Sequence, residues 1–263
     1  MRLNRSFQFL ALIFVFIFCA LPLLPTAKAD GLSDLKSALT SLQNDDAIKA
    51  KIAVKLDKTE GEGKEIERKA GNASIALETS AHGLSVSYSP ETIKQLSAEQ
   101  AAYESTDGTQ IKTATVAAIE AINVGNLRKM TDASQHLNSK LSRATFKNEQ
   151  ADVLQGQPAR LLTFELRNGN LSKKEQAYVK KYEGVLKIWT NQDGTPLASI
   201  LDESYAGRAY LVVSFKLTQK ESLTYDLAGK RLVATRYETL NKNTGGGELG
   251  AIKIVRTLEL QQP

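Results

Sequence analysis

The second half of the chain reads almost throughout as β-strand, and this constrains the fold more than any other feature. From residue 144 onward, apolar and polar residues alternate in segments such as "VLKIWT", "RLVATRYETL" and "AIKIVRTLEL". Period-two alternation places apolar side chains on one face of a strand and polar ones on the other. Turn residues separate most segments, at Asp193-Gly194, Ala228-Gly229 and Gly245-Gly246-Gly247. The pattern predicts consecutive antiparallel strands joined by short turns.

The first half combines strands with helices. "AIKAKIAVKLD" (47–57) alternates over ten residues, and two further strands are predicted through 66–77 and 84–88. Helical spacing and start signals predict helices near 31–45 and 90–105, and a third stretch over 113–142 that is interrupted at Gly125. No linker divides residues 30–263, and no β-α-β alternation is visible. We therefore predict a single α+β domain with about nine antiparallel strands and roughly three helices.

Residues 1–29 are predicted to be a secretory signal that is cleaved near Ala29. Arg2 and Arg5 form a basic start, residues 9–20 are an apolar run that is short for a membrane span, and "LPLLPTAKA" supplies an A-x-A cleavage site. The alternative is an uncleaved N-terminal anchor. Cys19 does not indicate a lipoprotein, because bulky residues precede it. The mature chain is predicted to reside in the bacterial periplasm or outside the cell, with no membrane span.

The mature chain carries little net charge and no cysteine. Of the 34 basic residues three lie in the signal, which leaves 31 against 29 acidic ones. The basicity of the whole chain therefore gives no support for nucleic-acid binding. Cys19 is the single cysteine and leaves with the signal, which excludes disulfide and thiol chemistry. A secreted domain without disulfides depends on its core, and this favours a bacterial periplasmic protein.

No motif marks a catalytic or metal centre. His82 and His136 lie apart from any G-x-S-x-G turn, and no cluster has the spacing of metal ligands. "GGGELG" (245–250) fits G-x-G-x-x-G, but a strand-like run follows it where dinucleotide binding needs a helix. "KKEQAYVKKYEG" (173–184) reads as a charged loop or short helix rather than a nucleic-acid site. A remote pair of catalytic carboxylates stays open; otherwise we predict no catalytic residue, cofactor or metal.

The order of elements is similar to the LolA-like fold of bacterial periplasmic lipoprotein carriers and sigma-factor regulators. The segments that carry this resemblance are "GLSVSYSPE" (83–91), "VLQGQPARLLTFEL" (153–166) and "LKIWTNQDGTPLAS" (186–199). The resemblance covers most of 30–260, and its motifs are of low specificity. It implies a large curved antiparallel sheet, an unclosed half-barrel, with helices packed on its concave apolar face. It also implies binding of acyl chains or a lipidated partner without catalysis, although the helical stretch at 113–142 is longer than the carriers have.

On this basis the predicted function is non-enzymatic binding of a lipid, an acyl chain or a lipidated partner in an aliphatic groove. A core built mainly of Leu, Ile, Val and Ala suits an acyl ligand, but it is equally usual in an ordinary core. The alternative is an envelope protein that docks a protein partner through its sheet. Strand alternation places Trp189 on the same side as Lys187, and the turn after it reads as a hairpin corner. The candidate groove residues are Trp189, Leu211, Val213, Phe215 and Tyr88.

Overall fold

The computed structural model describes residues 30–62, 65–80, 82–105, 113–167, 177–209, 213–245 and 248–261. By their contacts, residues from Gly31 onward form one unit that carries every described helix and strand. No helix in these ranges is both long and apolar enough to cross a membrane. The helices are α1 (Gly31–Ser41), α2 (Pro90–Ser105), α3 (Ala114–Glu120), α4 (Val124–Thr131) and α5 (Ala133–Leu141). The strands are β1 (Ile48–Glu62), β2 (Glu65–Ser80), β3 (Gly83–Tyr88), β4 (Ala144–Leu154), β5 (Gln157–Leu166), β6 (Val179–Thr190), β7 (Pro196–Ala209), β8 (Val213–Ala228), β9 (Arg231–Gly245) and β10 (Glu248–Leu260).

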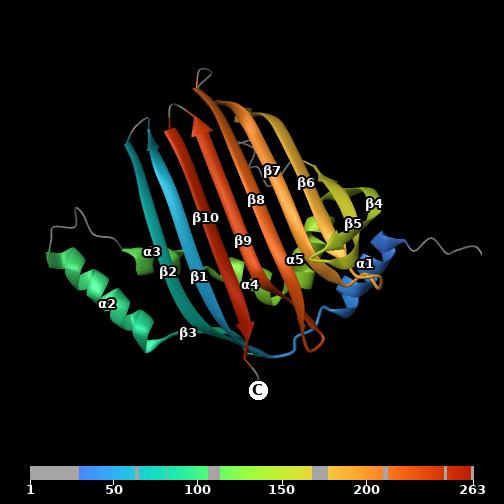
Figure 1. Ribbon diagram of the computed structural model, residues 1–263, viewed down its shortest axis with the longest axis horizontal. Coiled ribbons are helices and arrows are strands. Elements are labelled where there is room, and N and C mark those ends of the chain that lie inside the picture. Colours follow the sequence, from blue (N-terminus) through green and yellow to red (C-terminus); the bar gives the residue numbers. More distant parts are fainter. Residues whose placement is uncertain are drawn as a thin grey trace, which may run out of the picture. The chain divides into compact units, whose positions relative to one another are not determined.

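The ten strands form one antiparallel sheet (Figure 1). The strand order is β3-β2-β1-β10-β9-β8-β7-β6-β5-β4, and neighbours in this order pair antiparallel. β3 and β4 are the two edges, so within the described ranges the sheet does not close on itself. The predicted α+β fold with a large, open antiparallel sheet is confirmed. The described residues form ten strands and five helices, where about nine and three were predicted.

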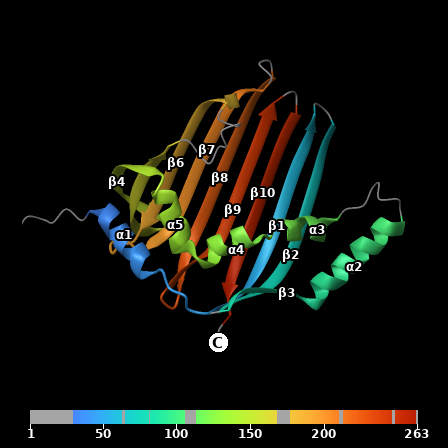
Figure 2. The same cartoon turned by 180° about the vertical axis from the view of Figure 1, so that it is seen from behind.

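The path of the chain explains where the helices lie. β1, β2 and β3 lead to one edge of the sheet, whereas β4 begins at the other edge and the chain returns strand by strand to β10, which pairs with β1. The chain must therefore cross the whole sheet between β3 and β4, and α2 to α5 make this crossing. Figure 2 shows α3, α4 and α5 in a row across one face, with α1 beside α5. This helix-bearing side is called the inner face below.

Local capping explains why the helical stretch predicted over 113–142 is divided into α3, α4 and α5. Asn123 has an extended backbone, and its side chain accepts a hydrogen bond from the Asn126 amide at 2.9 Å, which begins α4. Asp132 has a non-helical backbone and separates α4 from α5. Three short helices can follow the twist of the strands beneath them, which one straight helix cannot do.

Two strands differ from the prediction. In the sequence, "AYLVVSFKLTQ" (209–219) and "SLTYD" (222–226) predict two separate strands, but β8 runs without a break over Val213–Ala228. The polar residues Gln219 and Glu221 interrupt the apolar alternation, but the pairing of β8 with β7 and β9 continues through them. β6 begins at Val179, so the end of the segment read as a charged loop or helix is strand. In both places the backbone pairing of neighbours decides the structure, and not the hydrophobic pattern.

The hydrophobic core lies between the inner face and the helices. α1 contributes Leu35 and Leu39, α4 contributes Leu127 and Met130, and α5 contributes Leu137, all of them buried against apolar strand residues. Burying a side chain of this size stabilises the fold by about 1.5–3 kcal/mol relative to leaving it exposed. Much of the opposite, outer face is polar, with exposed ion pairs such as Lys49–Glu78 at 3.3 Å. The alternation of the strands therefore selects which face receives the helices.

The turn between β6 and β7 packs against α1. Arg160 on β5 donates one hydrogen bond to Asp34 of α1 and another to the Gln192 carbonyl of the turn, each at 2.8 Å. Gly194 has a φ of +88°, and a Cβ placed there would lie 2.3 Å from the backbone of Asp34. Glycine is needed at this position for both its positive φ and its lack of a side chain.

We expect Gly194→Ala to destabilise the fold more than Gly156→Ala. Gly156 has a similar φ of +84°, but a Cβ there meets nothing within 4 Å. Gly156→Ala should therefore lower the free energy of unfolding only by the backbone strain, about 1–2 kcal/mol, whereas Gly194→Ala must also move α1 away from the turn. Urea unfolding of both variants measures the difference. Equal losses of stability would show that the turn does not press against α1.

Candidate functional site

The helices cover only part of the inner face, and β8 shows where their cover ends. Along this strand Leu223 and Glu221 are 3% and 2% exposed, whereas Leu217 and Val213 are 36% and 39% exposed. Glu221 pairs with buried residues on both sides, Leu201 on β7 and Thr239 on β9. Figure 2 shows the ends of β7 to β10 extending past the row of helices. The inner-face residues beyond the Glu221 row are called the open section: Glu203, Tyr205, Val213, Phe215, Leu217, Gln219, Asn241, Asn243 and Ile252.

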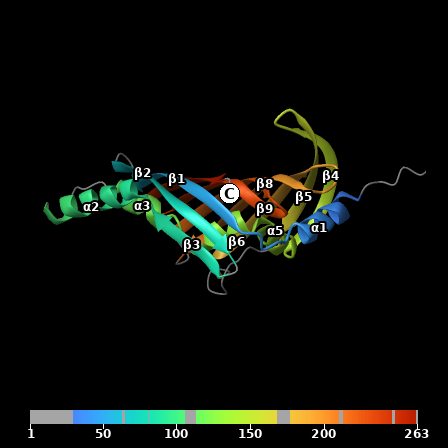
Figure 3. The same ribbon diagram turned by 90° about the horizontal axis from the view of Figure 1, so that it is seen from below.

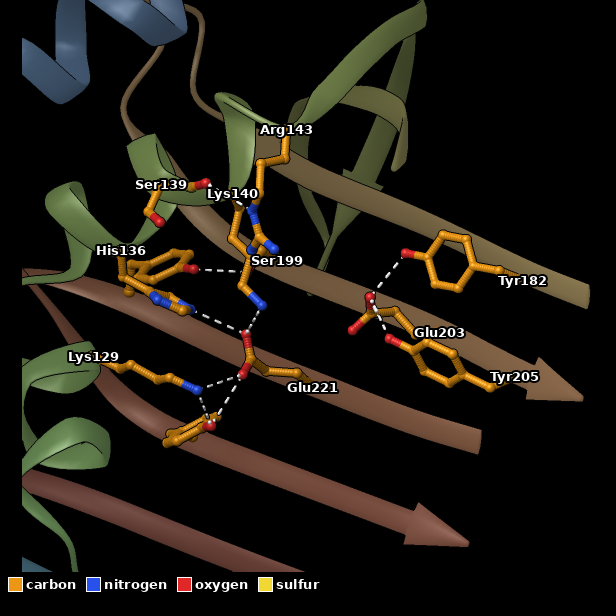
Figure 4. Close-up of polar contacts among 12 residues, drawn as sticks. Lys129, His136, Ser139, Lys140, Arg143, Tyr182, Ser199, Glu203, Tyr205 and Glu221 are labelled. Carbon is orange, nitrogen blue, oxygen red and sulfur yellow. Dashed lines mark hydrogen bonds and ion pairs between the residues drawn. The ribbon is translucent and has the colours of Figure 1, made fainter. Parts of the chain in front are cut away.

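Glu221 is the most heavily paired side chain at this boundary (Figure 4). Its Oε2 lies 3.2 Å from Lys129 Nζ and accepts a hydrogen bond from the Tyr237 hydroxyl at 3.0 Å. Its Oε1 lies 3.0 Å from His136 Nε2 and 3.5 Å from Lys140 Nζ. Lys129 comes from α4, and His136 and Lys140 come from successive turns of α5. One carboxylate on the sheet therefore binds two helices.

Opposing effects set the protonation of this cluster. Burial alone would raise the pKa of Glu221, but the hydrogen bond with His136 and the charges of Lys140 and Lys129 outweigh it and hold this pKa far below its ordinary range. Burial and the Glu221 carboxylate raise the pKa of Tyr237 to about 12, which keeps the phenol a hydrogen-bond donor. Burial opposes the charge of Lys129, yet Glu221 and Tyr237 raise its pKa. At neutral pH the ionised Glu221 carboxylate therefore faces the protonated ammonium group of Lys129.

Two buried arginines on neighbouring strands bind the ends of helices. Arg256 on β10 donates through Nε and Nη2 to the Ala121 carbonyl at the end of α3, at 3.2 and 2.9 Å. Its guanidinium also lies 4.9 Å from the centre of the Tyr237 ring. Arg231 on β9 donates to the Thr131 carbonyl at the end of α4 at 2.8 Å, and it pairs with Asp132. A cation at a helix C-terminus stabilises the unpaired carbonyl groups there.

These contacts fasten the helices to the sheet. Each oxygen of Glu221 already has two partners, so the buried carboxylate has no free position for a substrate. The nearby Ser199 hydroxyl is buried and lies 2.6 Å from the Tyr225 hydroxyl. Within the ranges that the structure describes, no group of three or more His, Cys, Asp or Glu side chains is placed to hold a metal ion.

The open section mixes apolar and polar side chains. On β7, Glu203 accepts hydrogen bonds from Tyr182 at 2.9 Å and Tyr205 at 3.1 Å, as Figure 4 shows. Toward β1 the inner face is hollowed to a volume of about 430 Å³, lined among others by Lys58, Glu60, Asn243 and Ile252. Asn243 pairs with Leu217, so this hollow adjoins the inner-face apolar residues of β8. These residues, Val213, Phe215 and Leu217, are called the apolar stripe of β8 below. The section offers contact area and hydrogen-bonding groups together.

The structure brings two of the predicted groove residues together and separates two others. Val213 and Phe215 lie on the inner face of β8 within the open section. Tyr88 is also on the inner face, but at the edge strand β3, and it is 45% exposed. Trp189 is half-buried on the outer face, where its Nε1 donates to Asp152 at 2.8 Å. Leu211 lies outside the described residues.

Sequence reasoning missed Glu221, Glu203 and Leu217. A signal for Glu221 was present, because a carboxylate two residues before Leu223 and four before Tyr225 occupies an inner-face position of the same strand. The i, i+4 spacing of His136 and Lys140 also places both on one side of a helix. Leu217 shares the alternation of Phe215, but its exposure depends on where the helices cross.

No protein-family model matches the chain, and no curated protein matches it. Among solved structures, a crystal structure of MucB in complex with MucA(peri) is similar over 88% of this chain and 93% of that chain. The sequence identity is 10% and the TM-score is 0.21. These values are too low for the likeness to bear on the fold or the function of this chain.

We expect Glu221→Gln to lower the free energy of unfolding by about 3 kcal/mol, because removing one partner of a buried ion cluster leaves the others unpaired. The folded-state pKa of Glu221 lies below its unfolded value of about 4.3. The stabilisation from the cluster is therefore complete above that pH and is lost as the pH falls toward the folded-state pKa. Urea unfolding at a series of pH values measures both effects, and the variant should lose less stability on acidification.

Glu183→Gln is the matched control. Glu183 is an exposed carboxylate on β6 that pairs with Lys181 at 2.7 Å, so the substitution makes the same change of charge without breaking a buried cluster. Its stability should stay close to that of the unmodified chain. Equal effects of the two substitutions would contradict a special role for Glu221.

Proposed function

We propose that this chain is a non-catalytic binding protein that docks a segment of another protein on its open section. One observation carries the proposal: the inner-face stripe of β8 passes from buried residues to the exposed Leu217 and Val213 within one strand. A closed core beside an exposed apolar patch is typical of an interaction surface. It is also the combination that distinguishes a docking module from an open acyl-binding groove.

The chemistry of the lining favours a protein partner over a lipid. Gln219, Asn241 and Asn243 lie beside the apolar stripe of β8, and Glu203 faces it from β7. An acyl chain that covered such groups would remove them from water without replacing their hydrogen bonds, at a cost of roughly 1–3 kcal/mol for each group. A polypeptide supplies donors, acceptors and apolar side chains together. We therefore place the protein-docking alternative ahead of the predicted aliphatic groove.

The rim of the open section adds a charge preference. On β1 and β2 the inner-face positions beyond Lys58 and Lys69 are occupied by four glutamates in two cross-strand pairs: Glu60 with Glu67, and Glu62 with Glu65. Like charges placed opposite each other on one face repel. Lys69 already bridges Glu60 and Glu67, at 3.4 and 3.5 Å, and Lys58 also pairs with Glu60. A basic flank on the partner would relieve the repulsion that is left between Glu62 and Glu65, so we propose a segment that is apolar over β8 and basic toward β1.

We further propose that residues 1–29 direct export and are removed near Ala29, and that the protein acts in the bacterial periplasm. The open antiparallel sheet with helices on one face is the architecture that the resemblance to LolA-like proteins implies, and this supports an envelope role. A lipidated partner that binds through its polypeptide is consistent with both proposals.

Photo-crosslinking tests the docking face. p-Benzoylphenylalanine replaces Leu217 on the inner face or Val185 on the outer face, which are 36% and 38% exposed. After irradiation of producing cells, mass spectrometry identifies the adducts. We expect one protein to crosslink to the Leu217 site and not to the Val185 site. The intact mass of the same protein shows whether the chain begins at Asp30.

Two outcomes would contradict the proposal. The first is the same set of adducts at both sites, because that pattern would mean that proteins meet the two faces at random. A lipid adduct at Leu217 without a protein adduct would restore the acyl-groove hypothesis. Native mass spectrometry of the purified protein tests the same outcome independently. A bound acyl lipid at near-equal stoichiometry would also support the acyl-groove hypothesis.

A further inference from the structure

The two edges of the sheet are protected very differently against pairing with another strand. An edge strand directs every second N–H and C=O away from the sheet, and proteins block such edges with charges, bulges, prolines or covering helices. β4 uses several of these devices. It carries Lys147, Glu149 and Asp152, and its pairing with β5 has an irregularity between Phe146 and Asn148. Glu149 also accepts a hydrogen bond from the first amide of α1 at 3.0 Å.

β3 uses none of these devices. Its sequence "GLSVSY" has no charge and no proline, and its pairing with β2 is regular over all six residues. Among the residues that the structure describes, no strand pairs with its outer side. The part of β2 that extends beyond β3 is protected, because it carries Glu65, Glu67, Arg68 and Lys69, and α3 packs on it. The unprotected edge is therefore confined to residues 83–88.

Helix α2 leaves this edge free. The Ser89 hydroxyl caps the helix by accepting from the Thr92 amide at 3.1 Å, and the Thr92 hydroxyl donates to the Ser74 carbonyl on β2 at 3.1 Å. Farther along, Glu99 accepts from the Thr115 amide at the start of α3. These contacts hold α2 beside the part of β2 beyond β3, as Figure 1 shows.

We propose that β3 is a strand-addition site that binds an extended, uncharged peptide segment of another protein. Main-chain hydrogen bonds would provide affinity and alternate side chains would provide specificity, as in other β-augmentation complexes. On the inner face the added strand meets Leu84, Val86 and Tyr88, which are half-buried or exposed. The bound segment therefore has apolar residues at alternate positions. On the outer face it meets Ser85 and Ser87, which give no charge preference.

The length of β3 favours a peptide over a second copy of this chain. Six residues extend roughly 20 Å, and pairing along that length buries on the order of several hundred Å² in total. Stable dimers bury about 1,200 Å² or more. A short peptide needs no larger area, because it can also wrap onto the exposed ring of Tyr88 at the end of the strand. This inference does not rest on the open section, whose residues lie on β7 to β10 and not on β3.

The probe is a synthetic octapeptide that copies residues 73–80 with E78Q, because β2 is the strand that β3 already pairs with. Fluorescence anisotropy measures binding of the labelled peptide to the intact protein. Hydrogen exchange with and without the peptide then locates the site. We expect saturable binding, with slowed exchange in residues 83–88 and unchanged exchange in β4.

A pair of double variants tests the edge itself. Ser85→Lys with Ser87→Lys introduces the charges that protect other edges, and should weaken peptide binding by about tenfold or more. Ser97→Lys with Ser105→Lys makes the same change of charge on the exposed side of α2 and should leave binding within about twofold. Both pairs replace exposed serines, so neither threatens the core.

The proposal is overturned if the peptide does not bind at millimolar concentration, or if it slows exchange in β4 instead of β3. It is also overturned if both lysine pairs weaken binding equally, since charge and not edge pairing would then govern the interaction. A fourth contrary result is a concentration-dependent dimer, measured by sedimentation, that protects residues 83–88 without peptide. That result would assign the edge to a second copy of this chain.

Discussion

The ionised carboxylate of Glu221, buried at the junction of sheet and helices, is the contact on which the rest of the structure depends. A lone buried charge is costly, and this one is tolerated because Lys129, His136, Lys140 and Tyr237 surround it. The three basic groups lie on α4 and α5, so satisfying the carboxylate fixes where these helices lie on β8 and β9. Apolar packing alone would let short helices shift along a sheet, whereas the buried ion cluster forms at only one position of the helices relative to the strands.

Fixing the helices also fixes what they leave uncovered. Arg256 and Arg231 hold the ends of α3 and α4, so the helix layer forms a band across the inner face, and the strands continue past it. The open section begins directly beyond the Glu221 row, and Leu217 and Val213 are exposed because the band stops there. β3 becomes an edge for a related reason: the chain leaves the sheet after Tyr88 to begin the crossing. Figure 3, seen from below, shows the edge strand β3 bending away from β1 and β2 toward the side of the sheet on which α3 and α5 lie.

Local rules predicted much of this fold. Strand alternation identified most of the strands. It also placed Trp189 on the other face of its strand from Leu186 and Ile188, because a period of two depends only on neighbouring residues. The division of α3, α4 and α5 was less visible, since Asn123 and Asp132 act through backbone geometry. The Glu221 cluster was missed because Lys129 and His136 lie 92 and 85 residues before the carboxylate in sequence. The exposure of Leu217 follows from that same long-range packing, so the open section also required the structure.

The helix layer ends at the Glu221 row and leaves Leu217 and Val213 of β8 exposed. Hydroxyl-radical footprinting of the intact protein tests this directly, because it reports the solvent exposure of individual side chains along one strand. We expect rapid modification of Phe215 and Leu217, and protection of Leu223 and Tyr225. Uniform protection along β8 would mean that the whole strand is covered and no docking face exists. Uniform modification would mean that the Glu221 cluster does not hold the helices in place.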